Sequence, residues 1–314
     1  MAVYAFTFPG QGSQSVGMGQ DLANAFSAAR AVFQEVDDAL GEHLSKTIFE
    51  GPIETLTSTE NAQPALLAVS MAVLRVLECD GGLDLAGRIN VLAGHSLGEY
   101  AALAAGRAFD IAQAAKLLRL RGQAMQRAVP AGEGGMAALI GVTLAQAEEI
   151  CRNASTAGST EIANDNGGGQ IVISGQMVGI DSAIAFAKEM GIKRAVKLPV
   201  SAPFHSSLMK PAEDVMAEAL GKADIAAPVV PVVANVTAAL ESDADTIRQN
   251  LIQQVTGRVR WRESVATMTG MGVDTFVEIG AGKVLSGLVR RIDPEVSTLS
   301  IGTPADIETF LKSL

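Results

Sequence analysis

The stretch Gly-His-Ser-Leu-Gly at residues 94–98 decides how this 314-residue chain is interpreted. The apolar run before it, residues 89–93, predicts a short buried strand, and residues 99–105 after it predict a helix. A serine on so sharp a turn needs flanking glycines, because neighbouring backbone comes too close for side chains. The turn would present the Ser96 hydroxyl near a helix N-terminus, where backbone N–H groups favour negative charge. We interpret Ser96 as a nucleophile; the alternative is a tight glycine turn with a capping serine.

The chain before this turn begins with a strand pattern and a helix pattern. Residues 3–8 alternate and predict a strand, which ends in the loop Pro-Gly-Gln-Gly at residues 9–12. Apolar residues recur at helical spacing from Phe26 to Leu40, and Gly41 is placed to end that helix.

Two longer helices are predicted on either side of the serine turn. Residues 64–77 are apolar on nearly all sides and predict a buried helix that begins at its proline. After the turn, Asp110 has the character of an N-cap, with Gln113 completing a capping box, for a helix that runs to about Val129.

The pattern changes after residue 130 and predicts a small inserted domain. Its order is β-α-β-β-α-β, the split unit of ferredoxin-like domains, with strands at 135–142, 161–163, 171–174 and 194–199 and helices at 144–154 and 180–190. Beyond it, residues 229–236 and 275–279 predict buried strands with helices between them. We therefore predict an α/β fold: a discontinuous larger domain with a mostly parallel sheet, residues 1–130 and 200–314, and a small domain at 131–199.

Composition excludes several classes of protein. The net charge is −10 and no long Lys/Arg run occurs, so we expect no nucleic-acid partner. The first residues lack a basic segment followed by an apolar stretch, and no window approaches the roughly 20 apolar residues that span a bilayer. Cys79 and Cys151 form no metal or redox motif. We expect a cytoplasmic monomer with reduced cysteines, no metal and no membrane association.

A serine hydroxyl needs a base, and the chain offers three histidines. His95 adjoins Ser96, but residues that flank such a serine tend to point elsewhere. His43 follows the first helix in a polar loop and is expected at the surface. His205 lies between prolines where the small domain ends, so elimination favours His205 as the base; the alternative is a histidine that caps the following helix. No histidine follows His205, which argues against the usual esterase order of serine, acid and C-terminal histidine.

Arg121 is placed unusually for a charged residue. On its helix the residues one turn away are Leu117, Leu118 and Met125, so the guanidinium lies on the apolar face. A buried guanidinium needs a partner. The partner is either a carboxylate of the chain, in a structural ion pair, or the carboxylate of a substrate held by two hydrogen bonds.

Several motifs in fixed order resemble a known family. They are FPGQGSQ at residues 8–14, QPA at 63–65, GHSLGEYAAL at 94–103, Arg121-Gly122 with Met125, FHS at 204–206 and EIGAG at 278–282. Over essentially its whole length the chain resembles the malonyl-CoA:acyl-carrier-protein transacylases of bacterial fatty-acid synthesis. It is also similar to the acyltransferase domains of polyketide synthases.

The resemblance implies an α/β-hydrolase-like large domain with a ferredoxin-like insert, and a ping-pong reaction. Ser96, deprotonated by His205, would attack the malonyl thioester, and the backbone N–H groups of Leu97 and Gln11 would hold the oxyanion. CoA would leave, and the phosphopantetheine thiol of acyl carrier protein would take the malonyl group. Arg121 would pair with the free malonyl carboxylate, and no cofactor beyond these substrates is implied.

Further pocket residues are implied by the same resemblance. A backbone carbonyl at Gln254 would orient the histidine, and Gln63, Met125 and Asn166 would line the pocket. The chain departs from the family pattern in two loops. Residues 166–170 are unusually rich in glycine, which predicts a looser pocket wall, and Gly257-Arg258 replaces a frequent proline-containing pair, which predicts a less stiff loop.

Three other functions compete with this interpretation. A serine esterase or thioesterase would use the same serine and histidine, although Arg121 favours an acidic acyl group. A non-catalytic carrier-protein-binding subunit would lack Ser96, His205 or Arg121. A trans-acting polyketide acyltransferase fits the same motifs. For the acidic carrier protein we expect docking at a local basic patch near the active-site mouth. We predict that it is one of two groups, Lys188, Lys193, Arg194 and Lys197 or Arg258, Arg260 and Arg262; Arg290 and Arg291 form a third, smaller group, and the alternative is that these are solvated surface charges.

Overall fold

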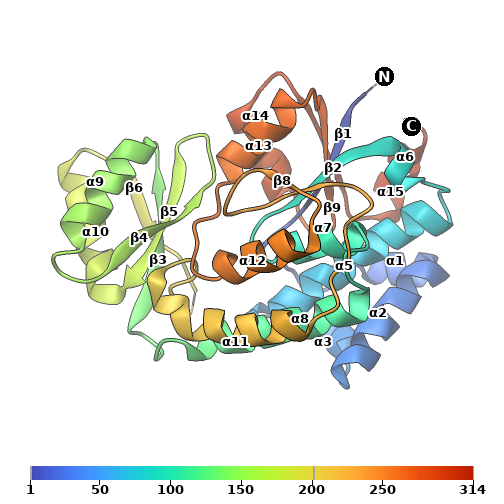
Figure 1. The fold of residues 1–314 in the computed structure, drawn as a ribbon, viewed down its shortest axis with the longest axis horizontal. Coiled ribbons are helices and arrows are strands. Elements are labelled where there is room, and N and C mark those ends of the chain that lie inside the picture. The colour runs from blue at the N-terminus through green and yellow to red at the C-terminus, as the bar shows by residue number, and fades with distance from the viewer. Residues whose placement is uncertain (1, 201, 314) are drawn as a thin grey trace.

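A computed structural model describes residues 2–200 and 202–313 and contains two sheets within them (Figure 1). The larger sheet has the strand order β10-β9-β1-β2-β7-β8, and all of its pairings are parallel except the last, between β7 and β8. The smaller sheet has the order β4-β5-β3-β6 and is antiparallel. The predicted α/β class with a mostly parallel sheet is confirmed.

The predicted strands and helices occur along the chain in the predicted order, and further elements that were not predicted, among them α3, β8 and β10, lie between and after them. The strands are β1 (Tyr4–Phe8), β2 (Ile89–Gly94), β3 (Gly134–Ile140), β4 (Thr160–Asp165), β5 (Gln170–Gln176), β6 (Arg194–Lys197), β7 (Val232–Val233), β8 (Leu240–Glu241), β9 (Thr275–Ile279) and β10 (Ser297–Ile301). The helices are α1 (Gln20–Ala25), α2 (Ser27–Leu40), α3 (Leu44–Glu50), α4 (Ile53–Thr57), α5 (Thr59–Cys79), α6 (Leu85–Arg88), α7 (Gly98–Ala105), α8 (Ile111–Arg127), α9 (Leu144–Ala154), α10 (Met177–Glu189), a 3₁₀ turn (Ser207–Met209), α11 (Lys210–Lys222), α12 (Ala244–Gln254), α13 (Trp261–Gly270), α14 (Val284–Ile292) and α15 (Pro304–Leu311).

The larger sheet is buried on both faces because side chains alternate along each strand. On β1, Phe6 and Phe8 belong to the core that contains α2, α5, α7 and α8. Ala5 of the same strand belongs to a second core, which α13 and α14 complete with Trp261 and Leu288. The sheet therefore lies between two layers of helices, and the ends of β1 and β2 lead into the loops that carry Gln11 and Ser96.

The smaller sheet has one covered face and one face turned toward the rest of the molecule. Ala137 and Leu139 of β3 form a separate core with α9 and α10, which lie on the outer side in Figure 1. Met136 of β3 and Val172 of β5 point the other way and join the core of the larger part. The alternation of β3 thus supplies a packed face on one side and a wall for a cavity on the other.

The buried helix α5 begins five residues earlier than the sequence pattern predicts. It begins at Thr59 and contains Pro64 in its interior. The early turn is held by tertiary packing against α8, because a Cβ added at Gly122 would lie only 2.6 Å from the Cα of Glu60. The predicted start at proline was wrong, since packing of buried side chains outweighed the cost of one missing backbone hydrogen bond.

Two smaller expectations also differ from the structure. The strand predicted over residues 229–236 is reduced to β7, because Pro231 precedes it and the chain turns back at Ala238, whose φ is 53°. Asp110 caps α8 by accepting from the N–H of Gln113, 2.6 Å away, but no return bond completes a capping box. The expected stop of α2 at Gly41 is confirmed, with φ at 68°.

Candidate active site

The turn between β2 and α7 holds Ser96 in a strained conformation that the flanking glycines permit. Ser96 has a φ of 54°, in the left-handed region that side chains other than glycine rarely adopt. A Cβ added at Gly94 would lie 1.9 Å from the carbonyl oxygen of Gly98, and one added at Gly98 would lie 2.2 Å from that of Phe8. Both glycines of the motif are therefore required by space, and Ser96 is presented at the start of α7.

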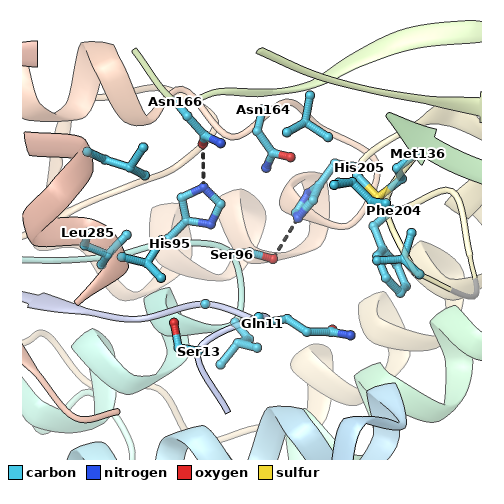
Figure 2. A pocket seen from close by; sticks show the side chains of 18 of the residues that line it. Gln11, Ser13, His95, Ser96, Met136, Asn164, Asn166, Phe204, His205 and Leu285 are labelled. Atoms are coloured by element: carbon cyan, nitrogen blue, oxygen red, sulfur yellow. Dashed lines mark hydrogen bonds between the residues drawn. The ribbon is translucent and has the colours of Figure 1, made fainter. Parts of the chain in front are cut away.

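Ser96 and His205 meet although they lie far apart in sequence. The Ser96 Oγ lies 2.7 Å from Nε2 of His205, as Figure 2 shows. On the other side of the ring, Nδ1 lies 2.9 Å from the carbonyl oxygen of Gln254 and 3.1 Å from that of Gly257. Because carbonyl oxygens only accept, Nδ1 carries the proton, and Nε2 is left with the lone pair that faces the serine hydroxyl.

The surroundings keep the imidazole of His205 uncharged. Burial lowers its pKa to about 3, with further lowering from the positive charge of Arg121 and from His95. The side chain is 4% exposed. At neutral pH it is therefore a free base in contact with a serine hydroxyl, which is the arrangement that activates a serine nucleophile.

Arg121 reaches the same point from α8, and its guanidinium is held by neutral side chains. Its Nη1 donates to Oε1 of Gln63 over 2.8 Å, and its Nη2 donates to Oε1 of Gln254 over 2.9 Å. Nη2 also lies 3.3 Å from the Ser96 Oγ. The salt bridges within residues 2–200 and 202–313 include none to Arg121, so the structural ion pair considered above is not formed. A buried guanidinium beside a nucleophile is suited to an anionic ligand.

Two backbone N–H groups near Ser96 remain available as donors. Neither the N–H of Leu97 nor that of Gln11 donates a hydrogen bond to another described residue. Both residues line the cavity that opens above Ser96. The N–H of Ser96 itself is already occupied, because it donates to Oδ1 of Asn235 over 2.7 Å.

This cavity has a volume of about 550 Å³ and is bounded by the smaller sheet and by the loops that follow β1 and β2. The smaller sheet and the loop after β4 contribute Met136, Val172, Asn164 and Asn166, and α14 contributes Leu285 and Leu288. Figure 2 shows Gln11 and Phe204 on the side of the cavity away from Asn166. The volume and the mostly apolar wall fit an acyl group with an attached arm.

The structure brings together eight of the nine predicted site residues as lining of this one cavity. They are Gln11, Gln63, Ser96, Leu97, Arg121, Met125, Asn166 and His205. The ninth, Gln254, lies behind the cavity wall, where its carbonyl contacts His205 and its side chain contacts Arg121. Of the two other histidines, His43 is 87% exposed. His95 points away from His205 and pairs with Asn166 over 2.9 Å.

The sequence is similar to known acyltransferases over nearly its whole length. A family model described as "Acyl transferase domain" matches residues 5–296. The malonyl CoA-acyl carrier protein transacylase of Bacillus subtilis is 44% identical over all of this chain and 98% of that protein. The chain belongs to the malonyl-CoA:acyl carrier protein transacylase family.

Solved structures of transacylases share the whole fold. The acyl-carrier-protein S-malonyltransferase of Bartonella henselae is 55% identical, covers 99% of both chains and superimposes with a TM-score of 0.97. A malonyl-transacylase solved in complex with its type II polyketide acyl-carrier protein is 40% identical over 100% of both chains, with a TM-score of 0.96.

Beyond the motifs shared with other transacylases, the site contains groups that sequence reasoning missed. Asn235 follows β7 and donates from Nδ2 to the carbonyl oxygen of Gly94 over 2.7 Å, besides accepting from Ser96. Glu99 lies beneath the serine turn and is fully buried. One signal for Glu99 was present, since it is the single charged residue in the apolar helix α7; Asn235 had no comparable signal.

The glycine-rich loop at residues 166–170 is tightly built. Gly167, Gly168 and Gly169 all have positive φ, between 57° and 75°. The N–H of Asn166 donates to the carbonyl of Gln170, and the N–H of Gln170 donates to the carbonyl of Gly167, which closes the loop. A Cβ at Gly167 would lie 2.3 Å from the side chain of Ile292. The glycines are thus required by three successive left-handed residues and by contact with α14.

The basic groups considered for docking differ in how far their charges are already paired. Arg258 and Arg260 both pair with Glu263, and Arg262 pairs with Asp165 over 2.8 Å. In the group at β6, Lys197 pairs with Asp181 over 2.5 Å, and Lys193 and Arg194 are exposed. From the third group, Arg291 lines the cavity together with Lys283.

Two features of residues 2–200 and 202–313 concern metal binding and membrane insertion. These residues contain no group of three or more His, Cys, Asp or Glu side chains that could hold a metal ion. The helix α5 is long and apolar enough to cross a membrane by length and composition, but 83% of that window is buried inside the protein.

Proposed function

We propose that this protein transfers the malonyl group of malonyl-CoA to the phosphopantetheine thiol of acyl carrier protein through a malonyl-Ser96 intermediate. One observation carries the proposal: the Ser96 Oγ lies 2.7 Å from a neutral histidine nitrogen and 3.3 Å from a buried arginine that has no carboxylate partner among the described residues. A nucleophile, its base and a cation for an acidic acyl group therefore meet at one point. The family membership supports the same reaction.

In the first half-reaction, the Ser96 oxygen attacks the thioester carbonyl carbon while its proton moves to Nε2 of His205. The developing oxyanion would receive hydrogen bonds from the N–H groups of Leu97 and Gln11, each such donor being typically worth about 3 kcal/mol in the barrier. The carbon–sulfur bond then breaks, and the CoA sulfur takes the proton from His205. In the second half-reaction, the carrier thiol repeats these steps in reverse.

Arg121 would hold the free carboxylate of the malonyl group throughout both half-reactions. Gln63 and Gln254 fix the guanidinium from either side, so that its direction is set before the substrate arrives. Met125, which lies 3.8 Å from Nε2 of Gln63 through its sulfur, and Asn166 would form further parts of the pocket. A hydrolase would use the same dyad, but a buried arginine has no role with an uncharged acyl group.

A trans-acting polyketide acyltransferase is the second candidate function. It is favoured by the similarity to a malonyl-transacylase that was solved in complex with a type II polyketide carrier protein. Both candidates load malonate on Ser96, and they differ in the carrier protein that accepts it. Transfer rates to purified fatty-acid and polyketide carrier proteins would separate them.

We further propose a division into an α/β-hydrolase-like domain, residues 1–130 and 200–314, and a ferredoxin-like domain, residues 131–199. The strand order of the smaller sheet and its separate core with α9 and α10 support this division. We expect the protein to act as a cytoplasmic monomer without a cofactor, and its two free cysteines, Cys79 and Cys151, fit a reducing compartment. Light scattering would test the oligomeric state.

The decisive experiment is mass spectrometry of the protein after incubation with malonyl-CoA alone. We expect one malonyl adduct, and peptide mapping should place it on Ser96. The variant Ser96→Ala should show neither adduct nor transfer, because no other described nucleophile has a base at hydrogen-bond distance in this cavity. An adduct that persists in Ser96→Ala would remove the assignment, and incubation with acetyl-CoA serves as the control for acyl selectivity.

A further inference from the structure

A buried acid under the serine turn has no place in the reaction described so far. Glu99 of α7 is 0% exposed, and its Oε2 accepts from the N–H of Asn235 over 3.0 Å and from Nε2 of Gln254 over 2.8 Å. Its Oε1 has no hydrogen-bond partner among the described residues. Glu99 is therefore joined to two residues that both contact the site.

Through these two residues Glu99 is connected to each group of the proposed reaction. Asn235 accepts from the N–H of Ser96, and Nε2 of Gln254 donates to the carbonyl oxygen of Ser96 over 2.9 Å. Oε1 of Gln254 accepts from Arg121, and the backbone oxygen of Gln254 lies against His205. The position of the nucleophile and the direction of the guanidinium thus depend on two hydrogen bonds that Glu99 accepts.

A second buried acid, Glu241 of β8, lies close enough to act electrostatically on Glu99. Glu241 is 4% exposed, and its Oε2 accepts from Nδ2 of Asn250 over 2.6 Å, while its Oε1 has no partner in the described part of the chain. Neither acid forms a salt bridge among the pairs between described residues. Two neighbouring carboxylates without a cation at contact distance cannot both be charged at low cost, so the pair is expected to retain a proton.

The net effect of the groups around Glu99 is to raise its pKa, which favours a retained proton. Burial and then the charge of Glu241 raise the pKa of Glu99 to about 8, while Arg121 of α8 acts in the opposite sense. Burial raises the pKa of Glu241 to about 7. Tyr100, the neighbour of Glu99 on α7, has its own pKa raised by burial and stays neutral. The proton therefore remains on Glu99 below that pKa and is lost as the pH rises through it.

We propose that Glu99 is a positioning residue that works in its uncharged form, sharing one proton with Glu241 beneath the serine turn. This inference rests on the proposed function. An uncharged Glu99 still accepts the hydrogen bonds that fix Asn235 and Gln254. It leaves the charge of Arg121 unopposed, so that the guanidinium attracts the malonyl carboxylate with its full strength. An ionised Glu99 would oppose that charge through the Gln254 amide, which contacts both groups.

The first test compares Glu99→Gln with Glu99→Ala at pH 7. Glutamine offers the same neutral acceptor oxygen, whereas alanine removes the acceptor of two buried hydrogen bonds. We expect Ser96 of the glutamine variant to be malonylated roughly 30-fold faster than that of the alanine variant, which corresponds to about 2 kcal/mol for the two lost bonds. If both variants are folded, as judged by circular dichroism, and have equal rates, the proposal is overturned. An uncharged acceptor at position 99 would then have no effect on the malonylation of Ser96.

The second test is the pH dependence of malonyl loading, which a purely structural role would not alter. In the unmodified protein, kcat/KM for malonyl-CoA should fall severalfold between pH 7 and pH 9.5 as Glu99 ionises. Glu99→Gln should remove this fall. Glu241→Gln should move the fall to lower pH, because the neighbouring charge that raises the pKa of Glu99 is gone. A fall that is absent from the unmodified protein, retained in Glu99→Gln or unmoved in Glu241→Gln would refute the proposal.

These outcomes are separate from failure of the proposed function. If the protein forms no malonyl-Ser96 adduct at any pH, the proposed function fails before Glu99 is tested. If the adduct forms and its rate does not respond to Glu99 as described, only the inference about Glu99 fails. Should Glu99→Ala not fold, the pH profiles of Glu99→Gln and Glu241→Gln still decide the matter.

Discussion

The two sheets of this molecule contribute different things to one cavity. The larger sheet and its helices supply the charged and reactive groups: Ser96 after β2, Arg121 from α8 and the N–H of Gln11 after β1. The smaller sheet supplies uncharged wall, such as Met136 and Val172. The ends of parallel strands and the start of a helix present backbone donors to a nucleophile, whereas an antiparallel sheet offers a flat apolar face. We therefore expect changes in the larger part to affect the chemistry and changes in the smaller part to affect the fit of partners.

The largest effect after loss of Ser96 itself is expected for His205→Ala. Without a base the serine hydroxyl stays protonated, and malonyl loading should fall by at least roughly 10²- to 10⁴-fold. Stopped-flow measurement of CoA release would give the rate, with His43→Ala as a matched control because His43 is exposed and distant. A folded His205→Ala variant with near-normal turnover would place the base elsewhere.

The same histidine predicts an unusual acid limb of the pH profile. Since burial lowers the pKa of His205 to about 3, the imidazole stays neutral as the pH falls from 7 to 5. Loading rates measured over this range, where the protein remains folded, should therefore not show the loss that an ordinary histidine with a pKa near 6.5 would cause. A midpoint near 6.5 would contradict this environment for His205.

A smaller effect, with a change of selectivity, is expected for Arg121→Ala. The variant loses a charge-assisted pair with the malonyl carboxylate, which is typically worth about 1.5–3 kcal/mol, or roughly 10- to 150-fold in kcat/KM. Loading of acetyl, which has no carboxylate, should fall less, so the ratio of malonyl to acetyl adduct should drop. Competition between the two CoA esters, read by mass spectrometry, measures that ratio. An unchanged ratio would make Arg121 a structural residue.

The smallest effect is expected from charge changes on the surface of the smaller sheet. It is the most direct test of whether the smaller sheet affects partner binding alone. Reversing the charges of Lys193, Arg194 and Lys197 should raise KM for the carrier protein severalfold and leave CoA-dependent loading of Ser96 intact. A matched control reverses Arg258, Arg260 and Arg262, whose charges are already paired with Glu263 and Asp165. A larger rise of KM in the control would move docking to the other side of the cavity. Loss of loading in the first variant would break the division between the two sheets.

The sequence predicts those parts of the site that are subject to strict local constraints. The serine turn is predictable because two glycines are required by space. Arg121 is predictable because a cation on an apolar helix face needs an anionic or polar partner. His205 follows by elimination among three histidines. The βαββαβ order of the smaller sheet is likewise visible as a change of hydrophobic period.

Contacts between distant segments were beyond the reach of these patterns. Glu99, Asn235 and Gln254 meet beneath the turn only because β2, β7 and α12 are brought together by the fold. The early start of α5 and the short β7 were decided by packing at Gly122 and by Pro231, which local propensity does not register. Backbone carbonyls that face a histidine leave no trace in residue type. The carbonyl of Gln254 was predicted through family resemblance alone, and that of Gly257 was not predicted.

The imidazole of His205 is oriented by main-chain oxygens at Gln254 and Gly257, and this has a consequence for mutation. No side-chain substitution at either position deletes the acceptor, because every amino acid brings the same carbonyl. This part of the catalytic apparatus is therefore encoded by the path of a loop, and insertions, deletions or prolines that redirect the loop are the changes that reach it. It also releases the Gln254 side chain for a separate task, so that one residue serves the histidine with its backbone and the arginine with its amide.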